Sequence, residues 1–334
     1  MNIKKIGMTA LAASLVSVSA QAAELTVNGG ASINAGHYSG GSKLDFGRSF
    51  TMGNQLTFTG SGELDNGMNV SVSFVLDQND DSTTDAASLY SGGPFDSHSV
   101  TVSSDALGKL VFAGEGGSSA TTSINTTVSG DIWDSFDGRL NTNAASGAKI
   151  KEAGAGDNSF LYTAPSLVDG LSVFLSYDPQ STSEASVKSE IGYGVTYTGV
   201  EGLSVSYANA DIETHASTSS GDNTAVKATY AFGPVTVGYS VNEYDVGTAD
   251  DDQDLTSYSV SYTISENLSV SYGYEEIEDG ESGDQDSEYT KISASYTSGG
   301  VTLSASMSEA ENIDGTTDTR ADQDYYFLGA SFAF

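Results

Sequence analysis

Apolar and small polar residues alternate with a period of two along most of this chain. In residues 268–275, for example, leucine, valine and tyrosine alternate with serine and glycine. The same alternation recurs in residues 68–74, 235–241 and 301–308. Because successive side chains of a strand point to opposite faces, each segment predicts a β-strand with one apolar face and one small, hydroxylated face.

The last ten residues carry the strongest form of this pattern. Five apolar side chains share one face of a strand there: Tyr326, Leu328, Ala330, Phe332 and Phe334. A soluble protein rarely ends on such a strand, because an aromatic edge promotes aggregation. A closed barrel in lipid removes the edge and gives the apolar face a suitable solvent. The ending resembles the C-terminal signature of bacterial outer-membrane barrels, so Tyr326, Phe332 and Phe334 are interpreted as an assembly signal.

The connections between the predicted strands alternate in length. The short ones are Glu63–Gly67, Asp105–Gly108, Pro165–Gly170, Thr198–Gly202, Gly233–Pro234, Ser265–Asn267 and Ser298–Gly300. The long, acidic ones are Asp77–Ser97, Glu115–Asp157, Asp178–Glu190, Asp211–Asn223, Asp245–Asp254, Glu275–Glu288 and Glu309–Asp322. Short turns at one end and long loops at the other are typical of a transmembrane barrel and not of a Greek-key sandwich. We therefore predict an all-β, antiparallel transmembrane β-barrel of 16 strands with long extracellular loops, from near Leu25–His37 to Asp324–Phe334.

The N-terminus has the features of a secretory signal peptide. Lys4 and Lys5 precede a short apolar run, Ile6–Ala20, and small residues follow it. We predict a signal peptide over residues 1–22, with cleavage after Ala22 or Ala23, and a single barrel domain over residues 23–334. The apolar run is shorter than the roughly 20 residues that a transmembrane helix requires.

Composition excludes several classes of function. The formal net charge is −33, which excludes nucleic acid as a partner on electrostatic grounds. The chain has no cysteine, so it has neither disulfides nor thiol chemistry. Its three histidines, His37, His98 and His215, belong to no motif with a catalytic mechanism, and we predict that the protein is not an enzyme.

Three segments resemble the general bacterial porins, in particular those of alphaproteobacteria: Leu56–Met68, Phe95–Glu115 and Asp157–Leu171. The resemblance implies a homotrimer of 16-stranded barrels in a Gram-negative outer membrane, in contact with lipid and lipopolysaccharide. It implies a water-filled channel through which small hydrophilic solutes and ions diffuse passively. It also implies that the longest connection, Glu115–Asp157, is the third loop and folds into the lumen.

In such a pore the functional site is the narrowest point. We interpret six residues as the pore constriction: Glu115, Asp131, Trp133, Asp134, Asp137 and Arg139. Their carboxylates would raise the local concentration of cations. Glu152, Lys149 and Lys151 lie in the same loop. The alternative is that some of these carboxylates cap turns or form hydrogen bonds within the loop.

The family usually opposes this acidic loop with a cluster of basic residues on the wall, and here the sequence departs from the pattern. Only three arginines exist, Arg48, Arg139 and Arg320. Strand alternation predicts that Lys109, Lys227 and Lys291 face the lumen and that Arg48 lies at the rim. We therefore expect a weak transverse field and a preference for cations. Alternatively, each of these bases snorkels toward water or bonds to a loop.

Two acidic segments, residues 249–254 and 275–284, suggest weak binding of Ca²⁺ or Mg²⁺ through carboxylates. Such cations would bridge these loops to lipopolysaccharide phosphates. Neither has EF-hand spacing, so solvated loops are the default and no cofactor is predicted. Two other functions stay open: a substrate-selective porin, and a surface adhesin or ligand-binding barrel with a plugged lumen.

Overall fold

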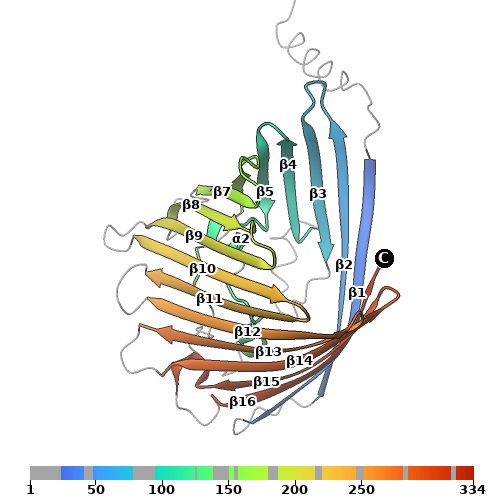
Figure 1. Ribbon diagram of the computed structural model, residues 1–334, viewed down its shortest axis with the longest axis vertical. Coiled ribbons are helices and arrows are strands. Elements are labelled where there is room, and N and C mark those ends of the chain that lie inside the picture. Colours follow the sequence, from blue (N-terminus) through green and yellow to red (C-terminus); the bar gives the residue numbers. More distant parts are fainter. Residues whose placement is uncertain are drawn as a thin grey trace, which may run out of the picture.

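The computed structural model describes residues 24–40, 48–77, 95–124, 126–137, 150–153, 157–179, 187–214, 220–245, 252–280, 285–316 and 321–334. Within these residues, sixteen strands form one closed antiparallel barrel (Figure 1). The strands are β1 (Glu24–Gly40), β2 (Arg48–Glu63), β3 (Asn69–Asp77), β4 (Ser97–Ser104), β5 (Gly108–Glu115), β6 (Ser159–Thr163), β7 (Leu171–Pro179), β8 (Val187–Tyr197), β9 (Leu203–Thr214), β10 (Gly221–Phe232), β11 (Val235–Asp245), β12 (Gln253–Ser265), β13 (Leu268–Asp279), β14 (Ser287–Ser298), β15 (Val301–Glu311) and β16 (Gln323–Ala333). The predicted 16-stranded antiparallel barrel is confirmed.

The barrel closes between its first and last strands. β1 pairs with β16 from Gly30 opposite Ala333 to Gly40 opposite Gln323. The terminal residue completes the seam: the Gly29 N–H donates to the Phe334 carbonyl at 2.8 Å, and the Phe334 N–H donates to the Gly29 carbonyl at 3.0 Å. Closure leaves the two end strands with no free edge along this paired stretch.

Strand alternation sorts the side chains as the pattern predicted. On β16, Leu328 and Phe334 are 61% and 74% exposed on the outer face. Outward-facing tyrosines recur on β7 to β14, among them Tyr177, Tyr239 and Tyr272. Serine, threonine and glycine occupy most of the inward positions of the same strands. Among the described residues, no helix is long and apolar enough to cross a membrane.

All seven predicted short turns are present at one end of the barrel, here called the short-turn end. At the opposite, long-loop end, the strands run further than predicted. β9 continues to Thr214, β13 to Asp279 and β15 to Glu311, so the acidic residues Glu275–Asp279 belong to a strand and not to a loop.

This error has a physical cause. Near the long-loop end the two faces of the strands exchange their polarity. On β13, Glu276 and Glu278 follow the outward-facing Tyr272 and Tyr274, whereas the inward-facing Ile277 is buried. Several inward positions are apolar there, because a loop covers them. An acidic outer face resembles a solvated loop when only the sequence is read.

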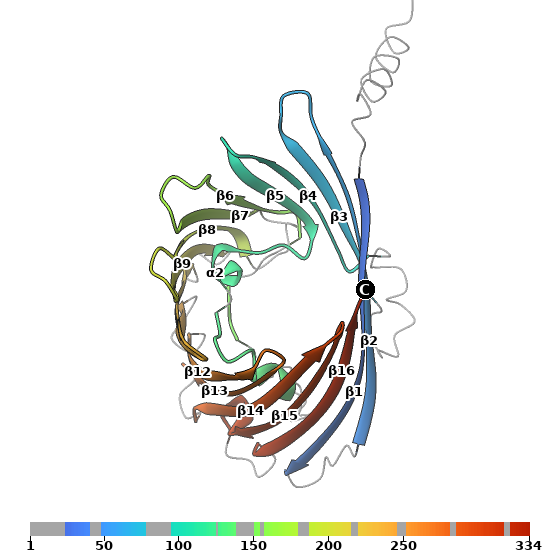
Figure 2. The same ribbon diagram turned by 45° about the vertical axis from the view of Figure 1, so that its right-hand side comes forward.

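Three short helices lie among the described loop residues: α2 (Ala120–Ser123), η2 (Trp133–Phe136) and η3 (Ile313–Gly315). The first two belong to the connection between β5 and β6, residues 116–158, here called loop 3. Figure 2 shows α2 and the green segment that follows it inside the ring of strands. Loop 3 therefore folds into the barrel. The predicted signal peptide, Lys149, Arg139, His215, Arg320 and residues 249–251 and 281–284 lie outside the described residues.

Candidate pore constriction

Loop 3 enters the lumen along β7 to β10. Ser119 caps α2, accepting a hydrogen bond from the Thr122 N–H at 3.1 Å. The Ala120 N–H donates to Ser176 Oγ of β7 at 2.9 Å. Ala120 and Ile124 pack against Phe174, Ala208 and Ala225 of the inner wall, so this buried cluster joins the loop to three strands. The first turn of the loop is thus fixed by polar and apolar contacts.

The next stretch of the loop crosses β10 to β12. Lys227 Nζ donates to the Thr127 carbonyl at 3.2 Å. The N–H groups of Val128 and Ser129 both donate to Ser257 Oγ at 3.2 Å. Lys227, predicted to face the lumen, therefore also holds the loop, which is the alternative that the sequence left open for these bases.

The Glu275 carboxylate is the strongest single anchor of loop 3. Its oxygens accept hydrogen bonds from Ser129 Oγ at 2.5 Å, the Ile132 N–H at 2.9 Å and the Trp133 N–H at 3.0 Å. These two backbone donors open η2 and have no partner within that helix. Glu275 is fully buried. The sequence reading missed this residue, although its alternation with Ser271 and Gly273 would have placed it in the lumen.

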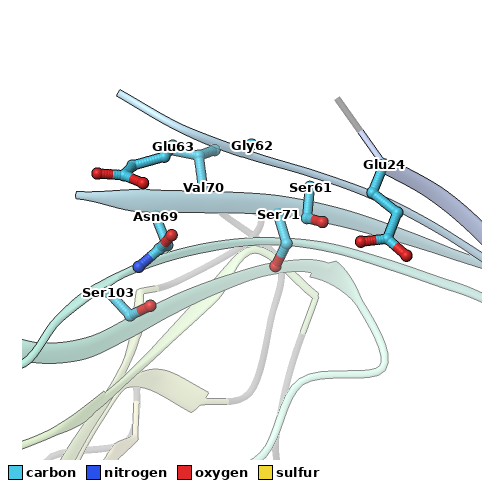
Figure 3. Close-up of a pocket in the computed structure, with 8 residues that line it drawn as sticks. All are labelled: Glu24, Ser61, Gly62, Glu63, Asn69, Val70, Ser71 and Ser103. Atoms are coloured by element: carbon cyan, nitrogen blue, oxygen red, sulfur yellow. The ribbon is translucent and has the colours of Figure 1, made fainter. Parts of the chain in front are cut away.

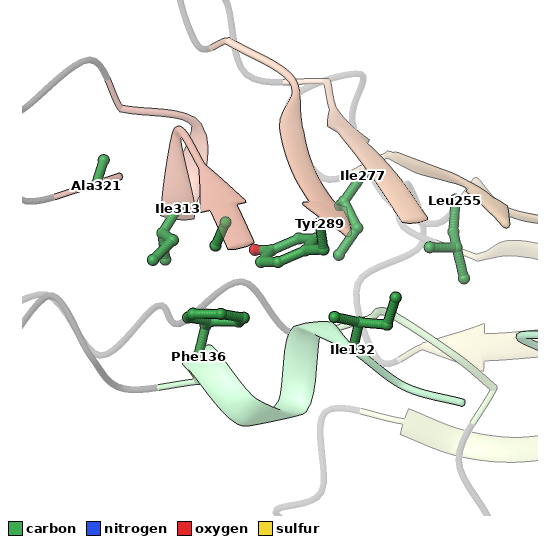
Figure 4. Close-up of a cluster of buried hydrophobic side chains, with 8 residues drawn as sticks. Ile132, Phe136, Leu255, Ile277, Tyr289, Ile313 and Ala321 are labelled. Atoms are coloured by element: carbon green, nitrogen blue, oxygen red, sulfur yellow. The ribbon is translucent and has the colours of Figure 1, made fainter. Parts of the chain in front are cut away.

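Beyond Glu275 the loop packs on an apolar patch of the wall. Ile132 and Phe136 face Leu255, Ile277 and Tyr289, with the contacts shown in Figure 4. Because these side chains are buried together, the patch anchors the tip of the loop by the hydrophobic effect. Tyr38 of β1 then donates its hydroxyl to the Ser135 carbonyl at 2.5 Å. We call residues 119–124 and 126–136 the outgoing limb of loop 3. Its contacts with the wall extend from β7 to β1.

The return limb, residues 150–153, lies nearer the long-loop end. The Lys151 N–H donates to Gln253 Oε1 at 2.6 Å, and Lys151 Nζ forms an ion pair with Asp279 at 3.1 Å. The Ala153 N–H donates to Asn223 Oδ1 at 2.9 Å. These wall residues precede or follow the anchors of the outgoing limb by four positions, about 13 Å along a strand. Loop 3 is therefore docked in two tiers.

Glycines make room for the outgoing limb. A Cβ atom at Gly238 would lie 2.9 Å from Val128 Cβ, and one at Gly273 would lie 2.8 Å from Ser129 Cβ. A Cβ at Gly192 would lie 2.8 Å from Ala120 Cβ. Separations this short cannot be accommodated without movement of the loop. Glycine is required at these positions so that the two backbones can approach.

Asp131 presents a carboxylate from the docked loop. It adopts a left-handed backbone conformation, with φ 48°, which aspartate tolerates better than most residues. Thr127 Oγ1 donates to Asp131 Oδ1 at 2.6 Å, and the Asp131 side chain is exposed. Asp134 is also exposed, whereas Trp133 and Asp137 are half-buried. Four of the six predicted constriction residues thus lie on the segment that folds into the barrel.

Glu152 adds a titratable group on the return limb. Burial raises the pKa of its carboxyl above the ordinary value. A hydrogen bond from Thr126 Oγ1 offsets part of this rise, and the nearby Asp131 carboxylate adds to it. Glu152 and Asp131 are therefore coupled electrostatically across the two limbs.

The other predicted site residues are placed as follows. Glu115 is the last residue of β5, and its carboxylate lies 3.7 Å from His98 Nδ1. Lys109 is exposed beside the short turn after Asp105, far along β5 from the loop. Lys291 of β14 pairs with Gly273 of β13 and is half-buried. For these three residues a pore role stays a prediction.

The predicted assembly signal lies on the outer face of the seam. Tyr326, Phe332 and Phe334 are all exposed there. The Phe334 ring covers Gly29 of β1, where a Cβ atom would lie 2.6 Å from Phe334 Cε2. The role of these residues in assembly stays a prediction, because the contacts describe only the finished barrel.

A cavity of about 340 Å³ lies on the wall near the short-turn end (Figure 3). Its lining comes from Glu24, Ser61, Gly62, Glu63, Asn69, Val70, Ser71 and Ser103. Carboxylate, amide and hydroxyl groups dominate this lining. The wall on this side therefore suits hydrated, polar solutes. Among the residues that the structure describes, no group of three or more acidic, histidine or cysteine side chains is arranged to hold a metal ion.

A closed barrel with an apolar outer face, a polar inner face and a loop docked inside it defines an outer-membrane channel protein. A sequence model of the Gram-negative porin family matches residues 7–296. The chain therefore belongs to the Gram-negative porin family, and its place is the outer membrane.

Solved porin structures resemble the barrel. The anion-selective porin from Comamonas acidovorans superposes with a TM-score of 0.69 at 16% identity, over 93% of this chain and 100% of that chain. A porin refined at 1.8 Å resolution gives a TM-score of 0.63 at 19% identity, with the same coverage. A triple mutant of the Rhodopseudomonas blastica porin gives 0.62 at 17% identity, again with the same coverage. At such identities the likeness shows the fold. No curated protein matches the sequence.

Proposed function

We propose that this porin is a water-filled, cation-preferring channel for the passive diffusion of small hydrophilic solutes and ions. The observation that carries the proposal is the Asp131 carboxylate, which is exposed on a loop held inside the barrel. Nearby bases are engaged in holding loop 3: Lys227 binds the Thr127 carbonyl and Lys151 binds Asp279. Fixed carboxylates in a narrow aqueous passage raise the local cation concentration.

Fold alone does not set selectivity, since one of the similar barrels is an anion-selective porin. The sign of selectivity must follow from the charges that line each lumen. In this chain the described loop displays Asp131 and Asp134 as exposed carboxylates. A plugged barrel or an adhesin is the competing proposal, and it requires a lumen that conducts little.

The test is reconstitution of the purified protein into a planar bilayer under a salt gradient. Our proposal predicts open channels at low voltage and a reversal potential of the sign expected for cations. A folded barrel that gives no conductance would overturn the channel and favour the plugged alternative. A reversal potential of the opposite sign would overturn only the cation preference.

We further propose that three copies assemble through the face formed by β1 to β5. On the described parts of these strands no tyrosine faces outward, whereas β7 to β14 carry many. Tyrosines mark the surface that meets the lipid interface. The outward residues of the tyrosine-free face include Ile33, Phe50 and Met52. The mass of the detergent-solubilised protein tests this proposal: a trimer supports it and a monomer contradicts it.

A further inference from the structure

Three aromatic rings line the lumen beside the tip of loop 3. Tyr325 and Phe327 of β16 alternate with Tyr326 and Leu328, which are exposed outside, and therefore face inward. Tyr38 of β1 stacks on Tyr325, with ring centroids 4.2 Å apart. The centroids of Tyr325 and Phe327 are 6.3 Å apart. We name Tyr38, Tyr325 and Phe327 the aromatic ledge.

Two rings of the aromatic ledge, those of Tyr325 and Phe327, lie against glycines of the wall. A Cβ atom at Gly36 would lie 2.8 Å from the Tyr325 hydroxyl oxygen and 3.0 Å from Tyr325 Cε2. A Cβ at Gly329 would lie 2.7 Å from Phe327 Cζ. Each ring therefore covers the next inward position toward the short-turn end. Among the described rings, Phe327 contacts only that of Tyr325, and its half-buried side chain faces the lumen.

The inward positions paired directly with the ledge are polar and uncharged, and Lys291 of β14 lies opposite Ser308 one strand further along the wall. The inward residues paired with Tyr325, Phe327 and Gly329 on the neighbouring strands are Tyr38, Gly36 and Asn34 on one side and Ser308, Ser306 and Ser304 on the other. Amide and hydroxyl groups both donate and accept hydrogen bonds. Asn34 Nδ2 donates to Ser32 Oγ at 3.2 Å, which holds that amide beside the Phe327 ring. A Cβ at Gly329 would also lie 2.8 Å from Asn34 Oδ1.

An aromatic face beside neutral donors and acceptors fits the chemistry of a sugar ring. The face of an aromatic ring is electron-rich and attracts the weakly positive C–H groups of a pyranose. The hydroxyl groups around the sugar require partners that both donate and accept, which the amide and serines supply.

We propose that the aromatic ledge binds the ring of a neutral pyranose sugar as it passes the tip of loop 3. The inference rests on the proposed function, since a solute reaches the ledge only through a conducting lumen. It extends that function from unselective diffusion to a saturable site for one class of solute.

The experiment is the block of ion current by maltose in a planar bilayer, with the acyclic polyol sorbitol as the control at matched viscosity. The wild type is expected to show a saturable decrease in conductance with maltose and only the viscosity effect with sorbitol. The variant Phe327→Leu removes the aromatic face. It should weaken sugar binding and so raise the half-blocking concentration about two- to tenfold. The variant Phe327→Tyr keeps the ring and should restore the wild-type value.

Each outcome decides the inference. Normal conductance without saturable block, or equal block in wild type and Phe327→Leu, overturns it while leaving the channel intact. Absence of conductance before sugar is added overturns the proposed function and the sugar site together. If Phe327→Leu does not assemble, Gly329→Val tests the same contact, because its side chain displaces the Phe327 ring. Block in Gly329→Val equal to that of the wild type would then refute the ledge.

Discussion

At the scale of single residues, the position of loop 3 depends on side chains of the barrel wall. Glu275 shows this most clearly, because one buried carboxylate satisfies the two backbone donors at the start of η2 and the Ser129 hydroxyl. The position of loop 3 is therefore set from the wall.

Replacement of Glu275 by alanine should loosen the loop. Loss of the carboxylate leaves the Ile132 and Trp133 N–H groups without their partner, at a cost of about 1–3 kcal/mol for each unpaired buried donor. We expect noisier open channels and premature closure under voltage, measured as current fluctuation in single channels. The control is Glu276→Ala, which removes a carboxylate from the outer face of the same strand. Equal noise in both variants would show that Glu275 does not hold the loop.

We predict that Glu152 makes the ion selectivity of the pore depend on pH. Because burial raises the pKa of Glu152, the folded protein retains this proton to a higher pH than the unfolded chain does. The docked loop therefore gains stability as the pH falls toward the ordinary glutamate range and loses it as the pH rises through the raised pKa. Cation preference should begin to decrease on mild acidification, before ordinary carboxylates titrate.

The measurement is the reversal potential followed from neutral to acidic pH in wild type and in Glu152→Gln. The variant should lack the first decrease and keep the later one. If both proteins titrate identically, Glu152 does not contribute to the field of the pore.

At the scale of elements, the polarity of both faces changes along several strands, from the short-turn end to the long-loop end. Toward the short-turn end its outer face is apolar and its inner face is hydroxylated. Toward the long-loop end of β9 and β12 to β15, the inner face is apolar where loop 3 covers it, as at Ile212, Leu255 and Ile277. The outer face there carries carboxylates. The outer face of one strand thus changes from apolar to acidic along its length, and its inner face changes from hydroxylated to covered by loop 3.

This exchange limits what the sequence alone can predict. Alternation and turn residues located the sixteen strands and the short turns, because both depend on local chemistry. The strand ends and the role of Glu275 could not be located in this way. They depend on contacts with loop 3, which for Glu275 and Ile277 comes more than a hundred positions earlier in the chain. Asp131 was recognisable as a loop carboxylate, but its exposure follows from the docking of the loop.

The close approach of loop and wall can be tested at Gly273. A valine there would place Cβ 2.8 Å from Ser129 Cβ, so the loop must shift, and overpacking of this kind costs about 1–3 kcal/mol. We predict altered conductance and reduced thermal stability of the folded barrel on unheated gels. Gly30→Val is the matched control, because Gly30 also lies on the inner face and the nearest atom to a Cβ there is the Phe332 carbonyl oxygen, at 3.5 Å. A Gly273→Val protein that behaves like the control would contradict the docked position.

At the scale of the whole molecule, the barrel forms a closed wall, and loop 3 is the segment that we propose sets the ion selectivity of the channel. The seam between β1 and β16 ends on the Phe334 hydrogen bonds, and the tip of loop 3 rests on the same strand through Tyr38. Closure of the barrel and docking of loop 3 thus both involve β1. The net charge of −33 supplies a negative field throughout, but only charges inside the lumen select among ions.

The central claim is that carboxylates on the docked loop set the selectivity of the pore. The most direct measurement is the reversal potential of the triple variant Asp131→Asn, Asp134→Asn and Asp137→Asn under a salt gradient. Asp254→Asn serves as the control, since it removes a carboxylate from the outer face of β12. We predict that the triple variant loses most of its cation preference while its folding and the control are unchanged. A triple variant with the wild-type reversal potential would contradict the claim.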